Sequence, residues 1–271
     1  MENIVVVALI GFLEGLTEFL PISSTGHLII LSSLLDFRGD DEKAFLITIQ
    51  LAAILAVCWS QRRLITTTIK NFAKERADSL IIKVMVAFIP TALIGLLLHD
   101  IVKTYLFSPI TVALALVIGG ICILVIEQQA REPSTDDCKD ITLLQAFQVG
   151  VFQALAIFPG VSRSGATILG GLLIGFSRKT AALFSFFLAI PTMFAATVFD
   201  LWQHPDLLNT NNLRMLAVGF TITFVTALLT VNGLIRFVSR HSFKPFGYYR
   251  IAFGIIVIVT WSIGLVDWQP I

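Results

Sequence analysis

The sequence predicts an all-α polytopic membrane protein with an inverted-topology internal repeat. Three observations predict this fold. Hydrophobic residues make up 56% of the 271 residues and charged residues only 14%, a composition far from that of soluble proteins. Apolar runs long enough to cross a bilayer recur along the chain, and the second half repeats the pattern of the first.

The first repeat is expected over residues 1–140 and begins with two short apolar runs. Ile4–Leu13 and Leu28–Leu35 are both shorter than the ~20 residues that a spanning helix needs, and Pro21 lies between them. Irregular backbone at membrane depth survives only where protein or a wet cavity satisfies it, so we predict a re-entrant helical hairpin over about residues 4–35. Three spans are expected to follow, at Ala44–Ser60, Val84–Leu98 and Pro109–Ile126.

The second repeat is expected over residues 141–271. A constant offset of 139 residues aligns Gly150–Thr167 with Gly11–Leu28. The same frame aligns two further phenylalanine pairs, Phe37 with Phe176 and Phe45 with Phe184. A second re-entrant hairpin is therefore predicted over about residues 142–176. Three more spans are expected, at Thr180–Leu201, Leu213–Ile235 and Phe246–Leu265.

Three crossings in each half are an odd number, so the second half must be inverted relative to the first. The two hairpins would then enter from opposite faces and meet near the midplane, where paired interrupted helices indicate a binding site. The positive-inside rule gives the orientation. Most of the 19 lysines and arginines fall on the side of Gln61–Lys83, Glu127–Asp140, Gly175–Lys179 and Arg236–Lys244.

That basic side is expected to be cytoplasmic. The first hairpin would then open to the periplasmic or extracellular side, and both termini would lie outside. Met1-Glu2-Asn3 lacks the basic region of a cleaved signal peptide, so we take the first apolar run as mature protein. We expect a multi-pass protein of the cell (inner) membrane.

Two carboxylates in the first hairpin predict a metal site. Glu14 and Glu18 are four residues apart, so on a helix they share a face and repel unless a cation bridges them. Mg²⁺ or Ca²⁺ held by one or two carboxylates and phosphate oxygens is a common arrangement. A solvated polar face is the alternative, but ionised groups between apolar runs usually line a protein interior or a wet cavity.

A polar turn follows these carboxylates. It comprises Ser23, Ser24, Thr25 and Gly26. Such a turn before a helix can present backbone N–H groups and a positive helix dipole to an anion, although a simple N-cap is the alternative. His27 comes next and can act as a general base, a nucleophile or a phosphate donor, with a helix–helix hydrogen bond as its alternative.

The second hairpin carries a matching turn with a cation. Its polar or small residues are Ser162, Arg163, Ser164, Gly165 and Thr167. Arg163 offers a planar fork that suits phosphate oxygens, or it could neutralise Glu14 or Glu18 as a buried ion pair. The repeat is asymmetric, because Glu14, Glu18 and His27 align with Gln153, Ile157 and Ala166. Both hairpins therefore predict one composite site for a phosphate or diphosphate on a lipid.

At these residues the sequence resembles the undecaprenyl-diphosphate phosphatase family, also known as bacitracin-resistance proteins. EGLTEFLPISSTGH at Glu14–His27 and PGVSRSGAT at Pro159–Thr167 are similar to the two signature motifs of that family. The resemblance implies hydrolysis of undecaprenyl (C55) diphosphate to undecaprenyl phosphate and inorganic phosphate. This reaction recycles the lipid carrier for peptidoglycan and other envelope polymers and implies bacitracin resistance on overproduction.

The resemblance also implies roles for individual residues and a divalent cation. Glu14 and Glu18 match the metal-associated acids, Ser23, Ser24, Thr25 and His27 the catalytic turn, and Ser162, Arg163, Ser164 and Thr167 the diphosphate-binding turn. We predict that Ser24 or His27 begins attack on the terminal phosphorus, with Glu18 holding the metal and helping as a base. A seryl intermediate, a histidyl intermediate and metal-activated water remain alternatives.

A second functional class is also compatible with the sequence. Inverted repeats with broken helices are typical of secondary transporters, so the same pocket could carry a polyprenyl phosphate across the membrane. The formal net charge of +1 gives no reason to expect nucleic acid as a partner. Membrane lipid is the expected surrounding, and a homodimer is one alternative for the assembly. Arg250, between aromatic residues in the last span, is either a substrate contact or an interface anchor.

Overall fold

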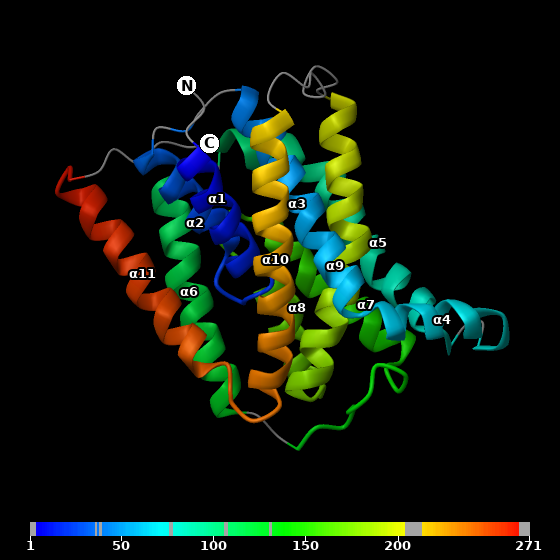
Figure 1. Cartoon of the computed structure of the whole chain (residues 1–271). Coiled ribbons are helices and arrows are strands. Elements are labelled where there is room, and N and C mark those ends of the chain that lie inside the picture. Colours follow the sequence, from blue (N-terminus) through cyan, green and yellow to red (C-terminus); the bar gives the residue numbers. More distant parts are fainter. Residues whose placement is uncertain are drawn as a thin grey trace.

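The computed structural model describes residues 4–35, 37, 40–75, 78–105, 108–129, 132–203 and 213–265. Regular structure in these ranges is helical apart from an isolated bridge between Thr135 and Phe176. The helices are α1 (Ile4–Thr17), α2 (Ser24–Leu34), α3 (Asp40–Ser60), α4 (Arg62–Glu75), α5 (Leu80–Tyr105), α6 (Pro109–Gln128), α7 (Leu143–Ala154), the 3₁₀ turn η2 (Leu155–Ile157), α8 (Arg163–Leu173), α9 (Arg178–Gln203), α10 (Leu213–Val238) and α11 (Lys244–Ser262). The predicted all-α class is confirmed (Figure 1).

The long helices form a membrane-type bundle. Five helices are long and apolar enough to cross a bilayer: α5, α6, α9, α10 and α11. A sixth crossing is available if α3 is counted with α4, which follows it after a bend of 74°. Large apolar side chains remain on the outside, such as Leu97 at 77% and Leu229 at 69% exposure. An apolar exterior of this kind fits a lipid surrounding, so the chain is a multi-pass membrane protein.

The basic segment after the first span forms the helix α4 rather than an irregular loop. Leu64 and Ile65 pack against the main core, whereas Arg62, Arg63 and Lys70 are exposed. Figure 1 shows α4 projecting sideways from the bundle. A helix with one apolar and one cationic face suits the boundary between lipid and water.

Two pairs of short helices interrupt the bundle at the predicted hairpins. A turn joins α1 to α2, and another joins η2 to α8. α1 packs on α10, where the Thr223 hydroxyl donates to the Gly11 carbonyl at 2.9 Å. α7 packs on α5 in the same way, and the Thr91 hydroxyl donates to the Gly150 carbonyl at 3.1 Å. Each hairpin is thus anchored on a long helix, which places the two turns inside the protein.

Glycine permits these close approaches. A Cβ atom on Gly15 would lie 2.7 Å from the Thr223 carbonyl oxygen, and one on Gly150 would lie 2.8 Å from the Ala87 carbonyl carbon. Both distances are shorter than van der Waals contact, so a larger residue would push the helices apart. Small residues serve this purpose in membrane proteins generally.

An ion pair fastens one end of the bundle away from the hairpin turns. The Glu127 carboxylate on α6 has no exposed side-chain surface and accepts from Arg178 Nη2 at 2.6 Å and from the Phe243 N–H at 2.7 Å. We expect Arg178→Met to lower the unfolding free energy by about 2 kcal/mol, because it leaves a buried carboxylate short of a partner while Arg178 itself is 38% exposed. The thermal midpoint in detergent measures this loss. Lys179→Met is the control, and equal midpoints for the two variants would contradict the expectation.

Candidate active site

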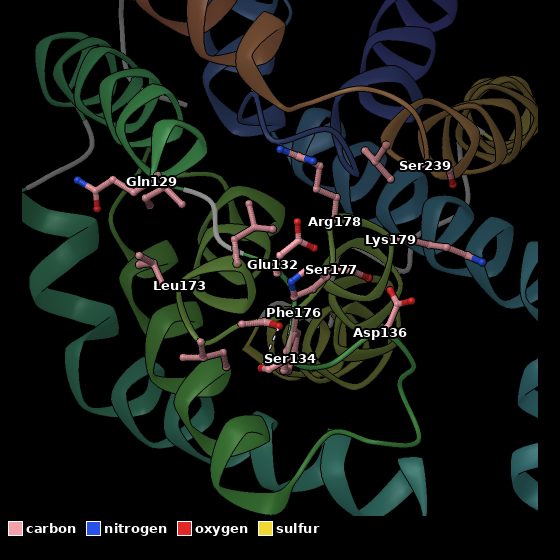
Figure 2. Close-up of a pocket in the computed structure, with 16 residues that line it drawn as sticks. Gln129, Glu132, Ser134, Asp136, Leu173, Phe176, Ser177, Arg178, Lys179 and Ser239 are labelled. Carbon is pink, nitrogen blue, oxygen red and sulfur yellow. Dashed lines mark hydrogen bonds between the residues drawn. The ribbon is translucent and has the colours of Figure 1, made fainter.

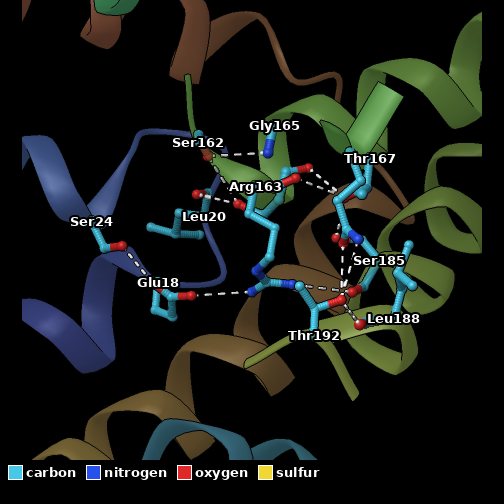
Figure 3. Close-up of polar contacts among 12 residues, drawn as sticks. Glu18, Leu20, Ser24, Ser162, Arg163, Gly165, Thr167, Ser185, Leu188 and Thr192 are labelled. Carbon is cyan, nitrogen blue, oxygen red and sulfur yellow. Dashed lines mark hydrogen bonds and ion pairs between the residues drawn. The ribbon is translucent and has the colours of Figure 1, made fainter. Parts of the chain in front are cut away.

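The two hairpin turns meet at one carboxylate. Arg163, the first residue of α8, places Nη2 3.2 Å from Glu18 Oε1. The Ser24 hydroxyl, at the start of α2, donates to the other oxygen, Glu18 Oε2. Figure 3 shows the three side chains in a row, with Glu18 in the middle. Three of the four residues predicted to be catalytic are therefore in direct contact across the hairpins.

Neighbouring residues fix the position of the Arg163 guanidinium, but one of its N–H groups has no partner in the described structure. Its guanidinium lies 5.8 Å from the centre of the Phe19 ring, and Nη1 donates to the Ser185 carbonyl at 3.5 Å. Its buried Nε has no hydrogen-bond partner among the described residues. The Nε–H group is therefore available to a phosphate oxygen. A purely structural ion pair with Glu18 would leave this donor unused.

Each turn is shaped by a serine in an unusual backbone conformation. Ser23 has φ 70° and Ser162 has φ 52°, in the left-handed region that residues with a Cβ rarely adopt. The Ser23 hydroxyl accepts from the Gly26 N–H at 3.3 Å, and the Ser162 hydroxyl accepts from the Gly165 N–H at 3.1 Å. Both serines are N-caps, the alternative left open by the sequence. Such strained positions cluster at functional sites.

The other predicted substrate-binding hydroxyls divide between surface and interior. Thr25 is exposed in the first turn. Ser164 is fully buried and donates to the Leu20 carbonyl at 2.7 Å, which ties α8 to the first hairpin. Thr167 is also buried, and its hydroxyl lies 2.6 Å from that of Ser185 on α9. Ser164 and Thr167 therefore hold the second turn in place, and sequence reasoning missed Ser185, the partner of Thr167.

His27 is engaged by neighbours that lie outside the turn motifs. Its Nδ1 lies 2.7 Å from the Ser23 carbonyl, which can only accept, so Nδ1 carries the proton. Nε2 then accepts from the Tyr249 hydroxyl at 2.7 Å in the neutral ring. The imidazole also stacks on Phe253, with centroids 4.3 Å apart. Both nitrogens are occupied, and in the described structure neither is bonded to Ser24 or Glu18.

Glu14 provides the test of whether the site suits a metal. It is fully buried, and neither of its carboxylate oxygens has a hydrogen-bond partner in the described structure. Glu18 lies one helical turn further along the chain. The described residues contain no group of three or more His, Cys, Asp or Glu side chains that could enclose a metal alone. Two carboxylates still fit a hard cation whose other ligands are phosphate oxygens and water.

A cavity of about 1180 Å³ lies elsewhere in the protein (Figure 2). It is bordered by the loop before α7 and by the junction of α8 and α9. Its charged lining residues are Glu132, Asp136, Arg178 and Lys179. It contains none of the predicted site residues, and its mixed charges are not arranged around a single anion. The contact of Ser24, Glu18 and Arg163 therefore places the candidate active site at the hairpin turns rather than in this cavity.

Comparison with known proteins gives the family. The sequence model of the family described as bacitracin resistance protein BacA matches residues 7–256, which include both hairpins. The chain belongs to the bacitracin resistance protein BacA family. The undecaprenyl-diphosphatase of Nitrosomonas europaea is 51% identical over 261 residues, 96% of each chain. That of Aromatoleum aromaticum is 49% identical over 98% of this chain and 97% of its own.

A third relative has the same name and similar coverage. The undecaprenyl-diphosphatase of Acinetobacter baumannii is 48% identical over 264 residues, which span 96% of this chain and 97% of the relative. The family resemblance found in the two turn motifs is thus confirmed along nearly the whole chain.

Proposed function

We propose that this protein is an undecaprenyl-diphosphatase, which hydrolyses undecaprenyl diphosphate to undecaprenyl phosphate and inorganic phosphate. The contact of Ser24, Glu18 and Arg163 between the two hairpins carries the proposal. It joins a hydroxyl, a proton acceptor and a phosphate-binding cation at one point. The names of the relatives supply the substrate. The reaction recycles the lipid carrier for envelope synthesis and accounts for bacitracin resistance in the family name.

The geometry favours Ser24 as the attacking group. Arg163 binds the terminal phosphate, and Glu18 accepts the Ser24 proton as Oγ forms a bond to phosphorus. The bond from phosphorus to the bridging oxygen breaks, and undecaprenyl phosphate leaves. Water then attacks the phosphoserine, and the bond between Ser24 Oγ and phosphorus breaks. Glu18 returns its proton to Oγ, and inorganic phosphate leaves with both protons of the water. His27 is less suited to attack, because both of its nitrogens are already hydrogen-bonded.

A divalent cation, Mg²⁺ or Ca²⁺, would be held by Glu14 and Glu18 and would neutralise charge on the diphosphate. The unpartnered oxygens of Glu14 support this part of the proposal. We expect added Mg²⁺ to raise the thermal midpoint of the wild type and to do so much less in Glu14→Gln. Glu127→Gln makes the same chemical change at the ion pair with Arg178 and is the control.

In the control, Glu127→Gln, we expect the Mg²⁺-dependent rise to remain even though the starting midpoint falls. If Glu14→Gln responds to Mg²⁺ as the wild type does, the Glu14 carboxylate is not a metal ligand.

The inverted repeat belongs to the same proposal, and four features support it. The strained N-caps Ser23 and Ser162 are 139 residues apart, the offset found in the sequence. Two edge-to-face ring pairs obey the same offset, Phe37 with Phe45 and Phe176 with Phe184. The packing of α1 on α10 and of α7 on α5 is reciprocal between halves. In Figure 1, α1 starts at the upper side of the bundle and the loop leading into α7 lies at the lower side.

We further propose that the first hairpin opens to the periplasmic or extracellular face. The excess of lysine and arginine on the opposite side of the bundle supports this orientation. The expectation that both termini lie outside concerns Met1 and Ile271, which are outside the described residues.

Release of inorganic phosphate in detergent micelles tests the proposed function. Micelles have no two compartments, so a pure transporter of polyprenyl phosphate would release none. We expect the purified wild type to release phosphate from a long-chain polyprenyl diphosphate and to lose this activity with a chelator. A folded, Mg²⁺-supplied wild type that binds the lipid without releasing phosphate would instead support the transporter.

The hydrogen bond from Tyr249 to His27 should affect turnover moderately. We expect Tyr249→Phe to lower the rate of phosphate release by about tenfold. The stacked ring remains, but His27 Nε2 loses the donor that fixes the imidazole, and Nδ1 of that ring bonds the Ser23 carbonyl in the turn that carries Ser24. Tyr248→Phe, at the exposed neighbouring position, is the matched control. Equal rates for the two variants would show that this hydrogen bond has no part in catalysis.

A further inference from the structure

Arg250 on α11 is a charged side chain that is only 2% exposed. Its guanidinium donates to four main-chain carbonyls: Nε to Leu116 at 3.3 Å, Nη1 to Pro21 at 3.2 Å, and Nη2 to Ala115 and Gly160, both at 3.0 Å. Four of its five N–H groups are therefore used within the protein. Among the described residues it forms no ion pair, so its charge is held by carbonyl dipoles alone.

These carbonyls belong to three separate parts of the fold. Pro21 lies in the turn of the first hairpin, three residues after Glu18 and three before Ser24. Gly160 lies in the turn of the second hairpin, three residues before Arg163. Ala115 and Leu116 belong to α6, on which α11 packs. One planar group thus connects both turns to the same helix pair.

We propose that Arg250 is a positioning residue that holds the two hairpin turns at the spacing at which Arg163 meets Glu18 and Ser24. The proposal rests on the proposed phosphatase function. It replaces both expectations drawn from the sequence for Arg250. An interface anchor would reach the membrane surface, and a substrate contact would keep its donors free, whereas this side chain is buried and bonded to backbone.

Glycines make the space that the guanidinium occupies. A Cβ atom on Gly119 would lie 2.7 Å from Arg250 Cζ, and one on Gly165 would lie 3.2 Å from Nη1. Gly160 has φ +90°, a backbone conformation that side chains with a Cβ rarely adopt, and this conformation directs its carbonyl at Nη2. The position of Arg250 is therefore specified by residues on α6, on α8 and in the second turn.

Substitutions separate the hydrogen bonds of Arg250 from its charge. Arg250→Lys keeps the charge but has a single ammonium group, which cannot reach carbonyls on all three segments. Arg250→Met keeps the stem and loses both charge and donors. Gly119→Ala leaves Arg250 intact but displaces its guanidinium, and Gly233→Ala is its control because a Cβ there meets nothing within 4 Å. Arg236→Met, at an exposed position on α10, is the control for Arg250→Met.

The test combines steady-state phosphate release with hydrogen–deuterium exchange on the purified full chain. In Arg250→Met we expect kcat to fall by about 10²-fold while KM changes by less than about threefold, because small misplacements of reacting groups cost rate more than binding. We expect Arg250→Lys and Gly119→Ala to lie between this variant and the controls. Amide exchange should become faster in residues 19–26 and in residues 159–166 together.

Three outcomes overturn the proposal or separate it from the function. Wild-type kcat in Arg250→Met and Gly119→Ala would overturn it, as would faster exchange confined to α6 and α11. If Arg250→Met fails to fold, Arg250→Lys and Gly119→Ala decide by the same two readouts. A wild type that releases no phosphate would overturn the phosphatase function. If amide exchange in both turns still became faster together in the variants, the positioning role of Arg250 would be supported.

Discussion

Ser24→Ala should abolish almost all phosphate release. We expect the rate to fall by at least about 10³-fold, since the variant lacks the oxygen that attacks phosphorus and single members of a catalytic unit often cost nearly the whole of its effect. Lipid diphosphate binding should be largely kept, because Arg163 and its contact with Glu18 remain. Initial rates of phosphate release and equilibrium binding of the same substrate measure the two effects.

Ser239→Ala is the control for this variant, because that exposed hydroxyl lies just after the end of α10 and donates to the Ile235 carbonyl. Rapid acid quenching of the wild type during its first turnover should also yield a phosphorylated serine at position 24. If Ser24→Ala keeps more than about a tenth of the wild-type rate, attack by His27 or by metal-activated water replaces the serine mechanism.

Arg163→Met should have the second largest effect. We expect kcat/KM to fall by about 10²- to 10³-fold, the usual cost of removing a donor that stabilises developing charge. Arg163→Lys should recover only part of this loss, because an ammonium group keeps the charge without the fork. Both substrate affinity and turnover are expected to suffer, in contrast to Ser24→Ala.

Arg178→Met is the matched control for Arg163→Met, since it breaks another arginine–glutamate pair, which joins α6 to the start of α9 and includes no residue of the hairpin turns. It should lower the thermal midpoint and leave the kcat of the folded protein unchanged. If Arg163→Met behaves in the same way, the pair with Glu18 only stabilises the fold.

Local sequence patterns predicted where the short helices break and named most residues of the candidate site. Short apolar runs around Pro21 and the repeat at an offset of 139 residues led to both turns, and the asymmetry between halves led to the prediction of one site built from both. These features depend on spacing within one segment or between aligned segments. They were therefore visible without a structure.

Contacts between distant segments were not predictable in this way. Tyr249 meets His27 from 222 residues away, and no pattern in the last span distinguishes it from a residue at the membrane boundary. Arg250 stood out as a charge in an apolar run, but its partners are backbone carbonyls, which every residue has. The inward direction of Thr167 depends on how α8 is rotated against α9, and composition does not fix that rotation.

A double-mutant cycle on Glu18 and Arg163 tests most directly whether the two hairpins form one catalytic unit. Phosphate release would be measured for Glu18→Gln, Arg163→Met and the double variant, beside the wild type. One composite site predicts that the double variant is about as slow as the slower single variant, because either change already disables the unit. Losses that multiply would contradict this account and show that the two residues act independently.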